Sequence, residues 1–69
     1  MQLSAQEKAE QRFATKVYYS RLINECLDLL QRTTLSPEER SDLRGKIEGY
    51  RELMVTDLRE IEKNFRRQL

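Results

Sequence analysis

The second half of this chain carries one stripe of apolar residues behind a strong helix-start signal, and this feature constrains the fold most. Before the stripe stands Ser36-Pro37-Glu38-Glu39, with a capping serine, a proline at the first helical position and a glutamate three residues after the serine. The apolar residues then recur at steps of three or four, which places them on one helical face. We therefore predict a long helix over residues 36–67. Its stripe comprises Leu43, Ile47, Tyr50, Met54, Leu58, Ile61, Phe65 and Leu69.

The first half of the chain is predicted to form a second helix, over residues 4–32. Ser4 and Glu7 repeat the serine-to-glutamate spacing of a capping box, and no proline or glycine interrupts the chain before Pro37. Residues 33–35 remain as a short connection, which favours antiparallel neighbours. The predicted fold is all-α, a single domain over residues 1–69 that forms a helical hairpin. The apolar face of the first helix comprises Tyr19, Leu22, Ile23, Cys26, Leu29 and Leu30.

Nearer the start of the chain, the same face of the first helix changes character. It carries Lys8, Arg12 and Lys16 in place of large apolar residues. We therefore expect the tightest packing near the turn and a more loosely held open end.

The chain is short for a self-sufficient core. A domain of 69 residues buries only about 60% of its unfolded surface and is marginal unless it is stapled or oligomeric. Its one cysteine, Cys26, excludes an internal disulfide and is expected to act as a small buried apolar residue. We therefore expect association into a helical bundle, with further copies of the chain or a larger protein as the partner.

Some small or apolar residues fall outside both stripes and suggest a second interface. Their alternative interpretation is ordinary surface exposure, and two of them are glycines that a helix can tolerate at a cost of about 1 kcal/mol each. Gly45 and Gly49 are four apart on the side opposite the main stripe, where close approach of another backbone would compensate that cost. The candidate second interface comprises Phe13, Val17, Gly45, Gly49 and Leu53.

The composition argues against several classes of function. The chain has no histidine, which excludes the common zinc fingers and catalytic triads. We find no motif for catalysis, metal or nucleotide binding, so we expect neither an enzyme nor a cofactor. The absence of a long apolar run argues against a membrane span. A free thiol without an apolar leader favours a cytoplasmic protein.

The charged residues are nearly balanced and alternate along the chain. Thirteen basic residues stand against twelve acidic ones, whereas nucleic-acid binders usually gather a basic excess on one face. Nucleic-acid binding is therefore a third hypothesis, behind the two kinds of protein binding, and it rests on a basic cluster that also complements the helix dipole. That cluster is Arg59, Lys63, Arg66 and Arg67. The pairs Asp28–Arg32, Asp42–Lys46 and Glu62–Arg66 have the spacing of four that favours ion pairs within a helix.

One stretch of the second helix resembles a known class of protein. The segments Leu35-Ser36-Pro37-Glu38-Glu39-Arg40 and Leu43-Arg44-Gly45-Lys46-Ile47, followed by Tyr50-Arg51-Glu52-Leu53, are similar to the second helix of short hairpin proteins encoded among the structural genes of tailed bacteriophages. This resemblance covers about twenty residues and implies a small virion or assembly component without an active site. The overall plan is also similar to that of the hairpin chaperones of type III secretion.

The leading hypothesis from the sequence is a structural or assembly protein that self-associates or docks on a larger protein. The alternative is a small chaperone that sequesters a helix of another protein. Both interpretations require apolar residues that the hairpin itself leaves uncovered.

Overall fold

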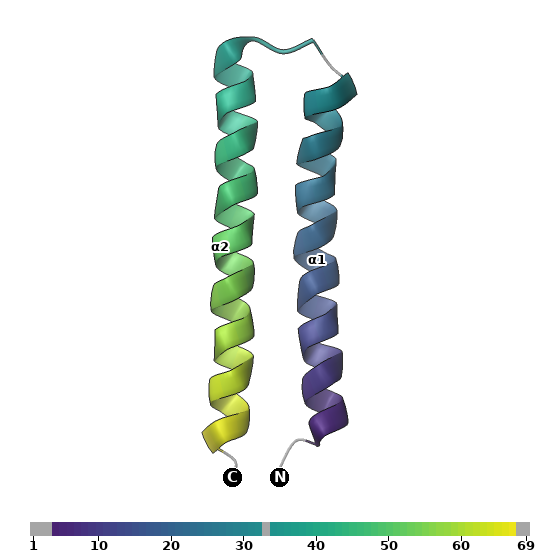
Figure 1. The fold of residues 1–69 in the computed structure, drawn as a ribbon, viewed down its shortest axis with the longest axis vertical. Coiled ribbons are helices and arrows are strands. Elements are labelled where there is room, and N and C mark those ends of the chain that lie inside the picture. Colours follow the sequence, from purple (N-terminus) through teal and green to yellow (C-terminus); the bar gives the residue numbers. More distant parts are fainter. Residues whose placement is uncertain (1–3, 33, 68–69) are drawn as a thin grey trace.

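The computed structural model describes residues 4–32 and 34–67, with side chains up to residue 65. It contains two helices, α1 (Ala5–Arg32) and α2 (Pro37–Arg67), and no strand within the described residues. The predicted all-α fold is thus confirmed. The helices lie side by side and run in opposite directions, so that the start of α1 and the end of α2 share one end of the molecule (Figure 1). Leu69, the last residue of the predicted stripe, lies outside the described residues.

Both helices begin at the serines that the sequence marks as caps. At α2, the Glu39 amide donates to Ser36 Oγ and the Ser36 amide donates to Glu39 Oε1, each at 3.2 Å. This reciprocal pair satisfies two backbone donors that the first turn would leave free. At α1, the Glu7 amide donates to Ser4 Oγ at 3.1 Å. Local chemistry therefore fixes where each arm starts.

The predicted stripes meet along the single seam between the helices. Tyr19, Cys26 and Ile47 are the most buried, at 9%, 6% and 6% exposure. No described large side chain is fully buried, because in a two-helix layer each side chain is covered from one direction only. The remaining predicted seam residues are half-buried, except for Leu29, which is exposed. Those half-buried residues are Leu22, Ile23, Leu30, Leu43, Tyr50, Met54, Leu58, Ile61 and Phe65.

The finished hairpin is a thin layer. Its Cα atoms extend over 51 × 16 × 11 Å, with the two helices in the plane of the longer axes. Within the described residues, neither helix is sufficiently long and apolar to cross a membrane. Because the hairpin is a thin layer, it has two broad faces, and the side chains on them determine what the molecule can contact.

Candidate interaction surfaces

A tyrosine and an aspartate link the helices at the middle of the seam. The Tyr19 hydroxyl donates a 2.5 Å hydrogen bond to Asp57 Oδ2. This bond, together with desolvation, raises the pKa of Tyr19 from 10.0 to about 12. The Tyr18 ring lies edge-on to Tyr19, with centroids 5.0 Å apart. Asp57 is not among the residues predicted from the sequence, where its only signal is its position directly before Leu58 of the apolar stripe.

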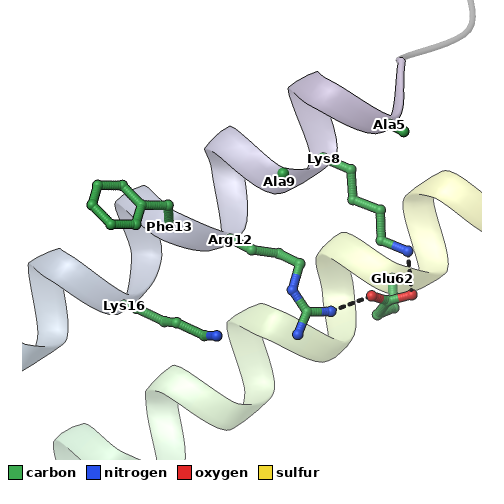
Figure 2. A pocket seen from close by; sticks show the side chains of 7 residues that line it. All are labelled: Ala5, Lys8, Ala9, Arg12, Phe13, Lys16 and Glu62. Carbon is green, nitrogen blue, oxygen red and sulfur yellow. Dashed lines mark hydrogen bonds and ion pairs between the residues drawn. The ribbon is translucent and has the colours of Figure 1, made fainter.

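At the open end of the hairpin, two cations of α1 bind one carboxylate of α2. Lys8 Nζ lies 2.8 Å from Glu62 Oε2, and the Arg12 guanidinium pairs with Oε1 of the same residue (Figure 2). The hydrogen bond from Lys8, reinforced by Arg12, lowers the pKa of Glu62 despite the opposing desolvation. Lys8 Nζ also stands 5.8 Å from the centroid of the Phe65 ring. The open end thus has a specific polar contact where the sequence predicted only loose packing.

Of the ion pairs predicted within each helix, the structure shows one. Asp28 and Arg32 do pair, with Arg32 Nε 2.8 Å from Asp28 Oδ1. Asp42 and Lys46, both within the described residues, are not joined by an ion pair. The side chain of Arg66, the predicted partner of Glu62, lies outside the described residues, so that pair stays a prediction. Glu62 itself meets the cations of α1. A contact between helices depends on how the arms are aligned, which spacing within one helix does not reveal.

One broad face of the layer, the Tyr18 face, gathers apolar residues from both helices. A shallow depression joins Gln11 and Thr15 of α1 to Asp57 and Ile61 of α2, which shows that these flanks lie on the same face. Residues three, four or seven positions from these lie on the same side of their helix and therefore belong to the same face. The Tyr18 face accordingly contains Tyr18, Leu22, Leu29, Tyr50 and Leu53, of which Tyr18, Leu29 and Leu53 are 60%, 49% and 51% exposed.

The opposite broad face, the Phe13 face, has fewer apolar residues and many cations. A shallow depression joins Phe13 and Lys16 of α1 to Glu62 of α2, and Phe13 projects away from α2 (Figure 2). Leu27 lies four helical turns after Phe13, and Val55 two turns before Glu62, so both share this face. Phe13 is 70% exposed, the most exposed large apolar side chain among the described residues.

The charges, which alternate along the sequence, separate between these two faces. Each residue turns about 100° around its helix. On that basis, the described side chains of the Tyr18 face include six acidic and two basic residues, and those of the Phe13 face include seven basic and three acidic ones. The Tyr18 face has Glu7, Glu25, Glu39, Asp42, Asp57 and Glu60, with Arg32 and Lys46. The Phe13 face has Lys8, Arg12, Lys16, Arg40, Arg44, Arg51 and Arg59, with Glu48, Glu52 and Glu62.

The residues predicted as one second interface do not form one surface of the hairpin. Phe13 lies on one broad face and Leu53 on the other, while the half-buried Val17 lies near the outer edge of α1. Gly45 and Gly49 lie along the outer edge of α2, remote from α1. A Cβ atom added to either glycine would meet no other atom within 4 Å. The hairpin itself therefore does not require glycine at these two positions.

The described residues contain no group of three or more His, Cys, Asp and Glu side chains placed to hold a metal ion. Cys26 is a buried free thiol in the seam. What the geometry offers is therefore two extended surfaces, each combining exposed apolar side chains with charges of predominantly one sign.

Comparison with known proteins identifies no relative. No family model, no curated protein and no solved structure matches the chain.

Proposed function

We propose that this chain is a non-enzymatic structural or assembly protein, a helical hairpin that self-associates or docks on a larger protein. The observation that carries this proposal is the distribution of apolar side chains. Among the described residues, three are buried in the seam, whereas six large ones are exposed on the broad faces. Fully covering a leucine or phenylalanine side chain contributes about 1.5–3 kcal/mol, so a second layer would add stability that a single layer lacks.

The general rules of helix packing support the same conclusion. Helical domains are stable when at least two layers enclose a common core. In this hairpin, α1 and α2 together form a single layer. Further helices laid on a broad face would convert the seam into the interior of a bundle. Those helices come from other copies of the chain or from a larger protein.

Light scattering coupled to size-exclusion chromatography tests this proposal. Over a range of loading concentrations, we expect a mass above the 8.3 kDa of the single chain and a melting temperature that rises with concentration. Leu53→Lys should shift the mass toward that of one chain. Thr56→Lys, which adds the same charge at the outer edge of α2, should not. A sharply melting monomer at every concentration would disprove the proposal.

A chaperone that sequesters a helix of another protein is a second candidate, because the same exposed Tyr18, Leu29 and Leu53 would receive such a helix. The resemblance to phage hairpin proteins suggests a virion or assembly component for the first candidate. The similarity in plan to the hairpin chaperones of type III secretion suggests the same role for the second. Co-purification from the native source with mass spectrometry separates them. Recovery of the chain as a homo-oligomer supports self-assembly. Recovery of the chain with one other protein, always the same and in equimolar amount, supports the chaperone.

A further inference from the structure

We infer that the hairpins associate head to tail, with the Tyr18 face of one copy covering the Phe13 face of the next. This inference rests on the proposed self-association and specifies its geometry. The partner of each face is thus a different face of an identical chain. Such contacts are heterologous, unlike the two-fold contacts of a closed dimer.

The distribution of charge favours the pairing of unlike faces. Pairing two Tyr18 faces would bring two predominantly acidic surfaces together, and pairing two Phe13 faces would do the same for basic surfaces. Like charges in contact disfavour an interface, whereas opposite potentials favour it and fix its register. Pairing unlike faces opposes Glu25 and Asp42 of one copy to the cations of the next, including Arg44 and Arg51.

Both faces also have exposed apolar side chains that a neighbouring copy would cover. Tyr18, Leu29 and Leu53 project from one face, and Phe13, Leu27 and Val55 from the other. Every copy would then cover all six when it has a neighbour on each side. A closed dimer would leave one of the two sets exposed to water.

The area of each face matches that of a stable interface. The Cα atoms span 51 Å by 16 Å in the plane of the helices, so each face covers about 800 Å², which is what each partner buries in a stable interface of standard size. Each copy has two such faces. Repetition of the contact would give a stack of two-helix layers that is open-ended unless the rotation per step closes it into a ring.

The alternative occupant of the Phe13 face is a nucleic acid, because the face has a basic excess. Glu48, Glu52 and Glu62 interrupt that excess, and a phosphate backbone would meet them as repulsive neighbours. An acidic protein face with apolar side chains fits this mixed surface better. We therefore expect the Phe13 face to bind another copy of the chain in preference to DNA or RNA.

Charge reversal on one face at a time tests the inference. Arg44→Glu with Arg51→Glu alters the Phe13 face, and Glu25→Lys with Asp42→Lys alters the Tyr18 face. We expect each double variant to raise the concentration for half-assembly by tenfold or more at low salt, and an equimolar mixture of the two to restore assembly. Arg21→Glu with Lys63→Glu makes the same charge change as the first variant at the outer edges, and should assemble almost as wild type does.

A second pair of variants keeps the test valid if charge reversal unfolds the helices, which circular dichroism would reveal. Phe13→Ser and Leu53→Ser remove one exposed apolar group from each face, and both should weaken assembly. Sensitivity of only one face, or a mass that stops at the dimer at all concentrations, would overturn the head-to-tail geometry while leaving self-association intact. A wild-type chain that stays monomeric would remove the proposed self-association itself.

The double variant Arg44→Glu with Arg51→Glu also tests whether the Phe13 face binds nucleic acid. A labelled duplex oligonucleotide is titrated with wild type and with the Arg44 and Arg51 variant. We expect no binding by either protein at physiological salt. Binding that the variant abolishes, with assembly unchanged, would instead assign the Phe13 face to nucleic acid.

Discussion

The hydroxyl of Tyr19 donates its hydrogen bond to Asp57, a residue 38 positions later on the opposite helix. The bond lies in the seam and links the middle of α1 to the second half of α2. It is directional, unlike the apolar contacts around it, and so fixes which residues of the two helices face each other.

Replacing Tyr19 by Phe should lower the melting temperature of the hairpin, because the Asp57 carboxylate loses its donor while remaining half-buried. The wild-type protein should also lose stability at high pH. The pKa of the Tyr19 hydroxyl in the folded state is raised from 10.0 to about 12. The stabilisation by this hydroxyl is therefore complete below pH 10 and disappears as the pH rises through 12. Thermal melts at neutral and alkaline pH measure both effects. Tyr18→Phe is the control, and a Tyr19→Phe variant as stable as wild type at neutral pH would contradict the role of the bond.

Glu62 should make the hairpin sensitive to acid. Its pKa is lowered below the ordinary 4.5 by Lys8 and Arg12, so its contribution is present above pH 4.5 and is lost as the pH falls through the folded-state value. Melting temperatures of wild type should therefore fall more steeply in acid than those of Glu62→Gln. Glu10→Gln, at the outer edge of α1, should retain the wild-type slope. Parallel slopes for wild type and Glu62→Gln would exclude the ion cluster as a source of stability.

Replacing Gly45 or Gly49 by Ala should stabilise the hairpin by about 1 kcal/mol each, because alanine is the better helix former and the space beside each glycine is open. Urea denaturation under conditions that keep the chain dissociated measures this gain. If the same variants weaken assembly, another molecule approaches the outer edge of α2 at the glycines. A loss of stability in the dissociated chain would show that the open space is not available in solution.

Replacing Ile47 by Ala should destabilise the hairpin by about 2 kcal/mol, at the lower end of the range for a core aliphatic residue. Ile47 is 6% exposed, but the seam has only one layer and can partly close around the smaller side chain. Urea denaturation is again the measurement. The control is Val55→Ala, since Val55 is 43% exposed and should change stability little. Equal losses for both variants would mean that the broad face is already covered by another copy.

The sequence predicts the helices well because their signals are local. Ser36 and Glu39 act within one turn, and the apolar stripe that includes Ile47 follows from the helical period alone. The contacts of Asp57 and Glu62 escaped prediction, because they depend on how far α1 and α2 are offset along the seam. No pattern within a single helix records that offset.

The two charged faces escaped prediction for a related reason. Lys16 and Arg51 are far apart in the sequence and are separated by acidic residues such as Glu25 and Asp42. Only the antiparallel pairing brings the two cations to one face and the two carboxylates to the other. The charges are therefore balanced along the sequence, but they differ strongly between the Tyr18 face and the Phe13 face.

The two polar contacts between the arms also bear on how the chain can slip. A slide of one helix by a single turn is about 5.4 Å, and it would separate Tyr19 from Asp57 and, at the same time, the cations of α1 from Glu62. Apolar side chains at steps of three and four would find new neighbours after such a slide, whereas these polar groups would not. The hairpin thus has one favoured alignment, enforced at its middle and at its open end, and the turn need not be rigid to preserve it.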